Sequence, residues 1–157
     1  MKEIKVGLIG FGTVGKGLAE VLLMQRERLT RRTGMTIRLA GIADHHAPGL
    51  PERFSDIPLT KDGMDLINNP DIDIIVELIG GIEPAKTFVM QAIAAGKHVV
   101  TANKALLSQE GAEIFAAAAR KGVEVGFEAS VGGGIPVIKA LKEGLVANRI
   151  LSIMGIM

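Results

Sequence analysis

Apolar residues follow two alternating patterns along this chain. Short and nearly continuous apolar runs, rich in Val and Ile, are typical of strands covered on both faces of a parallel sheet. Between these runs, apolar residues recur every three or four positions, which indicates helices. The predicted strands span residues 4–9, 36–43, 72–79, 98–101 and 123–127, with a further strand at 149–157 that lacks a partner. The predicted helices span residues 13–32, 62–68, 84–95, 109–120 and 137–146.

This alternation predicts an α/β domain with a Rossmann-type, doubly wound parallel sheet and helices on both faces. Residues 45–60 contain three prolines, so we expect a loop there with at most one helical turn. We expect residues 1–148 to form one dinucleotide-binding domain. Residues 149–157 would begin the connection to a substrate and dimerisation domain.

The first predicted strand runs into the pattern Gly10-x-Gly12-x-x-Gly15, and apolar residues at helical spacing follow it. In this context the first glycine permits a tight turn, the second admits a pyrophosphate, and the third allows close helix packing. Amides at a helix start attract anions through the positive end of the helix dipole. We therefore predict a dinucleotide-binding loop made of Gly10, Phe11, Gly12, Thr13, Val14 and Gly15.

Asp44 stands at the end of the second predicted strand, 29 residues after Gly15. An acid at this position accepts hydrogen bonds from the adenosine ribose, although the usual spacing is about 20 residues. A long first helix explains the extra residues, and the alternative is an aspartate that only shapes a turn. As a ribose partner, Asp44 would favour NAD over NADP, because it would repel a 2′-phosphate.

Other distinctive residues also follow the ends of predicted strands, where open α/β sheets bind ligands. They are Gly80-Gly81, Thr101 to Lys104, and Glu128 to Gly134. Lys104 would place a cation at a helix start, against the dipole, which favours a functional charge over an ordinary surface lysine. The glycines at 132–134 either let the backbone approach a ligand or bend the chain, and freed carbonyls there could bind a hard cation.

Composition excludes several classes of function. The net charge is +1 and aromatic residues make up 3% of the chain, so neither a basic patch nor a base-stacking surface for nucleic acid is indicated. There is no cysteine, which excludes disulfides, thiolate nucleophiles and cysteine-based zinc sites. No uninterrupted apolar run is long enough to span a membrane. We therefore expect a cytoplasmic enzyme domain.

Three segments carry a resemblance to a known family: ELIGG at 77–81, TANKALL at 101–107, and FEASVGGGIPVIKAL at 127–141. Together they resemble the homoserine dehydrogenase family, and the resemblance extends over essentially the whole chain. It implies interconversion of L-homoserine and L-aspartate 4-semialdehyde with NAD or NADP, in threonine, methionine and isoleucine biosynthesis. It also implies that the full-length enzyme is a homo-oligomer.

The resemblance assigns further roles. Gly80, Thr101 and Lys104 would lie along the cofactor, with Thr101 and Lys104 near the nicotinamide, and Lys104 would be the catalytic proton donor. A sodium or similar ion would be held, mainly through backbone oxygens, at Glu128, Val131, Gly133 and Ile135.

Family members continue after this region into a substrate domain with acidic residues and a second lysine, and none of it is present here. We therefore expect a cofactor domain that is inactive by itself. Two alternatives stay open, namely another amino-acid dehydrogenase such as aspartate dehydrogenase, and a nucleotide-sensing module without chemistry.

Overall fold

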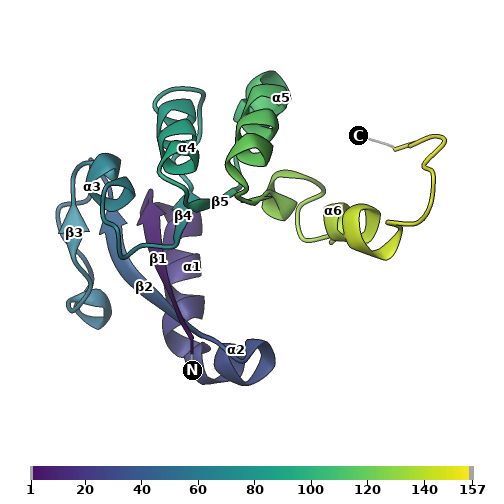
Figure 1. Cartoon of the computed structure of the whole chain (residues 1–157). Coiled ribbons are helices and arrows are strands. Elements are labelled where there is room, and N and C mark those ends of the chain that lie inside the picture. Colours follow the sequence, from purple (N-terminus) through teal and green to yellow (C-terminus); the bar gives the residue numbers. More distant parts are fainter. Residues whose placement is uncertain (1, 156–157) are drawn as a thin grey trace.

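The computed structural model describes residues 2–155, which form a parallel sheet of six strands with flanking helices (Figure 1). The strands are β1 (Glu3–Ile9), β2 (Thr36–Ala43), β3 (Leu59–Thr60), β4 (Ile74–Glu77), β5 (His98–Thr101) and β6 (Val125–Gly126). They lie in the order β3-β2-β1-β4-β5-β6, and all neighbours are parallel. This is the strand order of the doubly wound dinucleotide fold, so the predicted fold class is confirmed.

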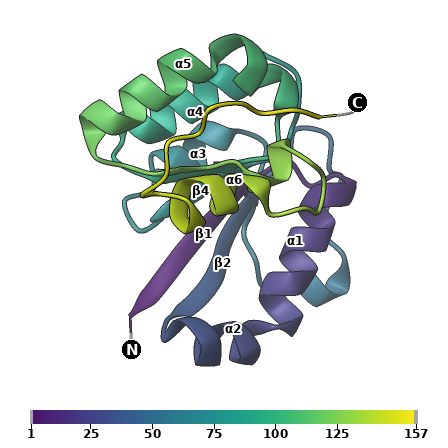
Figure 2. The same ribbon diagram turned by 90° about the vertical axis from the view of Figure 1, so that its right-hand side faces the viewer.

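Helices cover both faces of this sheet. The α-helices are α1 (Thr13–Met24), α2 (Arg26–Thr33), α3 (Gly63–Ile67), α4 (Ala85–Ala94), α5 (Lys104–Lys121) and α6 (Val137–Lys139). Shorter turns are η1 (Glu52–Phe54), η2 (Glu128–Ser130) and a π-helical turn, η3 (Ala140–Gly144). Figure 2 shows α4 and α5 together at one side of the sheet and α1 at the other.

Two apolar cores result, one on each face. On the first face, Ile75 of β4 and Val99 of β5 are fully buried against α3, α4 and α5. On the second face, Leu8 of β1 and Ile42 of β2 are fully buried with residues of α1 and η1. Burial on both faces explains why these strands read as continuous apolar runs.

The first helix is not continuous, as the sequence predicted, but divides at Gln25 into α1 and α2. Gln25 has a ψ angle of 13°, away from helical values, and its amide ends α1 on Val21 O. Helix α1 buries Gly15 and Ala19 against the sheet, whereas α2 buries none of its residues. With no buried residue of its own, α2 lies against β2 and does not continue the line of α1.

Other element bounds also differ from the prediction. A two-residue strand, β3, lies inside the expected loop and pairs with Ile42 and Ala43 of β2. The helix expected from residue 109, with Ser108 as its N-cap, begins instead at Lys104, because the side chain of Asn103 caps it. The expected strands 72–79 and 123–127 narrow to β4 and β6.

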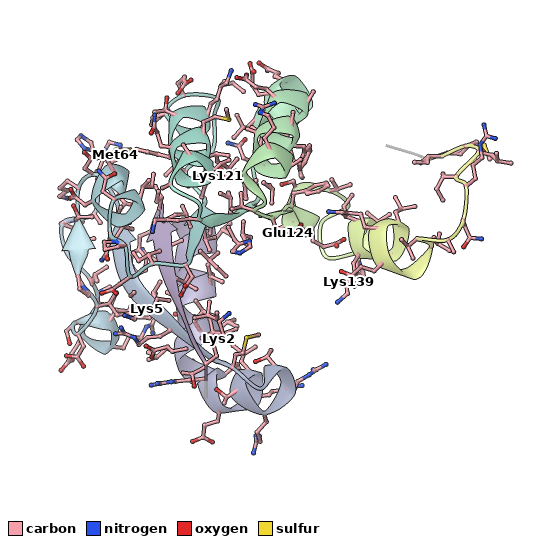
Figure 3. The ribbon with its side chains drawn as sticks, in the orientation of Figure 1. Lys2, Lys5, Met64, Lys121, Glu124 and Lys139 are labelled. Carbon is pink, nitrogen blue, oxygen red and sulfur yellow. The ribbon has the colours of Figure 1, made fainter. Side chains whose placement is uncertain are left out.

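The predicted strand at 149–157 is wrong for residues 149–155, which have no regular secondary structure, and its last two residues lie outside the described part. A strand needs a neighbour for its backbone groups, and these residues lie apart from the sheet, with Leu151 and Met154 largely exposed (Figure 1). Lys139 of α6 lies on the same side, far from Lys2 and Lys5 at the start of β1 (Figure 3).

Within the described residues, no helix is long and apolar enough to cross a bilayer.

Candidate cofactor site

The glycine turn after β1 depends on close backbone contacts. Gly10 has a φ angle of +100° and donates its amide to Ala43 O at 2.8 Å, which ties the turn to the end of β2. A Cβ atom at Gly10 would lie 2.8 Å from the carbonyl of Leu78, and one at Gly15 would lie 2.0 Å from Gly10 O. Glycine is therefore required at both positions, for the reasons that the sequence pattern indicated.

The start of α1 is open. Gly12 is its N-cap residue, and no side chain of the described residues caps this end. A Cβ atom added at Gly12 would meet no described atom within 4 Å. By contrast, Asp62 caps α3 and Asn103 caps α5 through side-chain oxygens. The first-turn amides of α1, which have no partner inside the helix, are thus left for an anion.

Asp44 fastens two loops together. Its Oδ2 accepts the amide of Phe11 at 2.7 Å, and its Oδ1 accepts the amides of His46 and Ala47, each at 2.8 Å. Burial opposes ionisation, but these three hydrogen bonds and the charge of His46 outweigh it, so the pKa of Asp44 is lowered. The carboxylate lies beside the glycine loop as predicted, but most of its acceptor capacity is used by the protein itself.

A cavity of about 860 Å³ opens between the ends of β1, β2 and β4. Its lining includes four predicted residues, Gly10, Gly12, Asp44 and Gly80. A neighbouring hollow of about 790 Å³ shares Gly12 and Asp44 and adds Phe11. The larger cavity is also lined by Ile9, Ala43, His45, His46, Lys61, Asp62, Gly63, Leu78, Ile79, Glu83, Pro84 and Phe88. It lies where the strand order reverses between β1 and β4, the usual ligand position in this fold.

His46 and Lys61 also line the cavity, and the sequence pattern did not assign either of them to it. They lie within or directly after residues 45–60, where the sequence predicts a loop. The only sequence signal is that both residues follow the end of β2 along the chain. It can be interpreted only when the structure shows that β3 places residues 59–60 beside that strand.

The other predicted residues do not line the larger cavity. Phe11 is buried and packs edge-to-face on Phe54, with ring centroids 5.6 Å apart, and its amide is already donated to Asp44. Thr13, Val14 and Gly15 lie in the first turn of α1, beside the cavity but not in its lining. Thr101 and Lys104 also fall outside the lining.

Glu77 is fully buried at the end of β4. A carboxylate is stable at such a position only when hydrogen-bond partners surround it, and Glu77 has three. Its Oε1 accepts the amides of Ile79 and Gly80 at 2.8 and 3.2 Å. Its Oε2 accepts the hydroxyl of Thr101 at 2.6 Å. The sequence did not show this network, because its members come from separate strands.

Lys104 is the first residue of α5 and is exposed. Among the described residues, no hydrogen bond or ion pair holds its ammonium group. The preceding Asn103 fixes this helix start, since its Oδ1 accepts the amide of Leu106 at 3.1 Å. Lys104 is therefore a cation on a rigid helix start at the ligand edge of the sheet.

The predicted ion-binding residues lie in the loop after β6. The carboxylate of Glu128 accepts amides at the start of α6, including that of Lys139 at 2.8 Å, so the side chain caps this short helix. The backbone oxygen of Glu128 accepts the amide of Val131 at 3.2 Å, and Gly133 has a φ angle of +61°. Between residues 2 and 155, no three His, Asp or Glu side chains gather as a metal cluster. Ile135 is largely exposed.

Comparison with known proteins adds a family to this geometry. The profile of the family described as "Homoserine dehydrogenase, NAD binding domain" matches residues 10–128. A homoserine dehydrogenase from Pseudomonas aeruginosa is 53% identical over 156 residues, which cover 99% of this chain and 36% of that protein. The chain thus spans about a third of the length of such relatives.

Two solved structures are also similar. A homoserine dehydrogenase from Thiobacillus denitrificans matches with a TM-score of 0.88 and 56% identity, over 95% of this chain and 35% of that one. A hyperthermophilic archaeal homoserine dehydrogenase in complex with NADPH matches with a TM-score of 0.76 over 92% of this chain and 50% of that one. Its identity of 24% makes it evidence for the fold alone.

Proposed function

Because this chain belongs to the family of homoserine dehydrogenase NAD-binding domains, we propose that it holds the dinucleotide for oxidation of L-homoserine to L-aspartate 4-semialdehyde and for the reverse reduction. The observation that carries the proposal is the uncapped start of α1 beside the cavity at the strand-order reversal. We propose that the complete reaction also needs the remaining length of such relatives, since this chain spans 36% of the protein from Pseudomonas aeruginosa.

We propose that the pyrophosphate lies against the open backbone at Gly12 and the first turn of α1. The adenosine would then lie toward Asp44, and the nicotinamide toward Gly80 and the start of α5. Asp44 retains acceptor capacity for a ribose hydroxyl, and no Arg or Lys directly follows it in the sequence. These features support NAD over NADP, although Lys61 in the cavity lining offers positive charge to a 2′-phosphate.

Lys104 is the residue that we propose as catalytic. When bound, the nicotinamide would supply hydride to the semialdehyde in the reduction and accept it from homoserine in the oxidation. The ammonium of Lys104 would donate a proton to the semialdehyde oxygen in the reduction, and the neutral amine would accept the hydroxyl proton of homoserine in the oxidation. Its exposed position without a protein partner supports this role, because a substrate oxygen could then be its partner.

A sodium ion at Glu128, Val131, Gly133 and Ile135 is a further proposal. Backbone carbonyls accept with two lone pairs, so an oxygen that already accepts an amide can still bind a hard cation. The Glu128 carboxylate is already used at the start of α6, which supports coordination through its backbone oxygen.

The experiment that tests the proposed function compares this chain with a longer protein that also contains the remaining length of its relatives. Calorimetric titration with NADH and NADPH should show binding by the 157-residue chain, while homoserine oxidation should require the longer protein. Full turnover by the short chain would show that the catalytic groups are misplaced. Absence of dinucleotide binding would contradict the assignment of the cavity.

A further inference from the structure

Few polar side chains of the described residues are buried, and most of those that are buried lie close together. Among residues 2–155, the buried polar side chains are those of Glu77, Lys97, Thr101, Asn103 and Ser130. All of these except Lys97 belong to one hydrogen-bonded network at the ligand edge of the sheet. None of their buried side-chain polar atoms lacks a partner among the described residues. A fully satisfied buried network specifies one arrangement of the segments that it joins.

Thr101 is the centre of the network. Its hydroxyl donates to Glu77 Oε2 at 2.6 Å and accepts the amide of Asn103 at 3.0 Å, and its own carbonyl accepts the hydroxyl of Ser130 at 2.9 Å. The side chain is fully buried. Because the hydroxyl already donates its one proton inside the protein, it has no proton to offer a cofactor. Any influence of Thr101 on the reaction has to pass through its neighbours.

Those neighbours define both sides of the proposed nicotinamide position. Glu77 Oε1 holds the amides that follow β4, including that of Gly80, which lines the cavity. Asn103 caps α5 with its Oδ1 and donates its Nδ2 to Gly81 O at 2.6 Å. Lys104 is the next residue along the chain. The glycine turn and the start of α5 are therefore joined twice, through the buried Thr101 hydroxyl and directly from Asn103 to Gly81.

We propose that Thr101 and Glu77 are positioning residues, which set the backbone of Lys104 at a fixed distance from the Gly80-Gly81 turn. The inference rests on the proposed function of Lys104. Loss of the hydroxyl would leave the Asn103 amide and one Glu77 oxygen buried without partners, so the two segments would rearrange. A displacement of about 1 Å at a reacting group can reduce turnover about 10²-fold.

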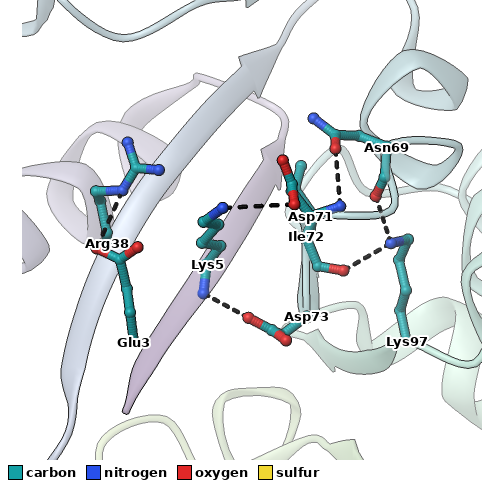
Figure 4. Close-up of polar contacts among 8 residues, drawn as sticks. All are labelled: Glu3, Lys5, Arg38, Asn69, Asp71, Ile72, Asp73 and Lys97. Carbon is teal, nitrogen blue, oxygen red and sulfur yellow. Dashed lines mark hydrogen bonds and ion pairs between the residues drawn. The ribbon is translucent and has the colours of Figure 1, made fainter. Parts of the chain in front are cut away.

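The test uses the longer protein with three substitutions. Thr101→Val keeps the shape of the side chain but removes the hydroxyl, whereas Thr101→Ser retains the hydroxyl. Lys97→Met is the matched control, because Lys97 is also buried but lies before β5, at the opposite edge of the sheet. Its Nζ donates to the carbonyls of Asn69 and Ile72 at 2.7 and 2.6 Å (Figure 4).

We expect Thr101→Val to lower kcat at least tenfold while the Kd for NADH changes less than threefold, at a temperature well below its Tm. Thr101→Ser should stay within about threefold of wild type in kcat, since it retains the hydroxyl. Lys97→Met should keep the wild-type kcat whatever its effect on Tm. Wild-type kcat in Thr101→Val would overturn the proposal. So would an equal loss of kcat in Lys97→Met, because the effect would then reflect general loss of packing.

Amide hydrogen exchange on the 157-residue chain gives a readout that does not need turnover. Thr101→Val should speed exchange at Gly80 and Leu106, whose amides the network holds directly, and leave Gly10 unchanged. Unchanged exchange at both sites would overturn the coupling. If the wild-type longer protein does not oxidise homoserine, the proposed function fails, and the exchange result still decides whether Thr101 joins the two segments.

Discussion

Alanine substitutions at Gly12 and Gly15 should separate the folding role of the glycine loop from its binding role. At Gly15 a Cβ atom would lie 2.0 Å from Gly10 O, whereas ordinary contacts begin near 3.4 Å. The backbone would have to move by about 1.4 Å. At Gly12 no described atom lies within 4 Å of a Cβ, and the φ angle of −74° suits any residue.

These geometries set the magnitudes. Overpacking costs about 1–3 kcal/mol, and the upper end applies at Gly15 because the obstacle is backbone. For a domain of this size, about 3 kcal/mol lowers Tm by about 6–12 °C. In Gly12→Ala, the weaker N-cap and the reduced freedom of the unfolded chain oppose each other, each by less than about 1 kcal/mol. The methyl group would instead occupy space that the pyrophosphate needs, so the affinity for NADH should fall about tenfold, or about 1.4 kcal/mol.

Thermal melts and NADH titrations on the two variants of the 157-residue chain measure both effects. We expect Gly15→Ala to lose stability and Gly12→Ala to melt within about 4 °C of wild type but bind NADH weakly. Wild-type NADH affinity in Gly12→Ala would refute the pyrophosphate position. A Gly15→Ala melt within about 2 °C of wild type would refute the packing argument.

Three further predictions concern charged groups. Folding lowers the pKa of Asp44, so its hydrogen bonds stabilise the native state above about pH 4. This stability is lost as pH falls through the folded pKa. Urea melts from pH 6 to 2 should show this loss in wild type but not in Asp44→Asn. In binding assays Asp44→Ala should relax a preference for NADH over NADPH, and a wild type that binds NADPH tenfold more tightly would contradict that preference. In the longer protein, Lys104→Met should reduce kcat/KM about 10²-fold in steady-state assays with normal folding, and near-normal kinetics would return Lys104 to the ordinary surface lysines.

The sequence predicted the sheet and the glycine turn because both follow from local patterns. Apolar runs of β-branched residues identify buried strands, and the spacing from Gly10 to Gly15 carries its own steric reasons. The strand β3 escaped prediction because two residues carry no periodicity, and its pairing with β2 depends on the loop that precedes it. The start of α5 was misplaced because Ser108 and Asn103 are both good capping residues, and only the structure shows that Asn103 bonds the amide of Leu106.

The site was less predictable than the fold, because its polar groups meet across long stretches of sequence. Asp44 was expected at the glycine loop, but its three backbone amide partners depend on how the loop after β2 folds back. Glu77 could not be explained from its own strand, since its partner Thr101 lies on the neighbouring strand, 24 residues later. The ion-binding residues and the catalytic role of Lys104 stay predictions that rest on the resemblance.

The central pairing of β1 with β4 has a consequence for folding kinetics. It brings Val6 beside Ile74, and therefore joins two halves of the chain across a long stretch of sequence. Such a distant pairing is entropically costly to close and forms slowly. The cavity takes its walls from both halves, so it comes into being only when this pairing does. A bound dinucleotide would consequently contact both halves of the chain. It would therefore stabilise this slowly forming pairing of β1 with β4.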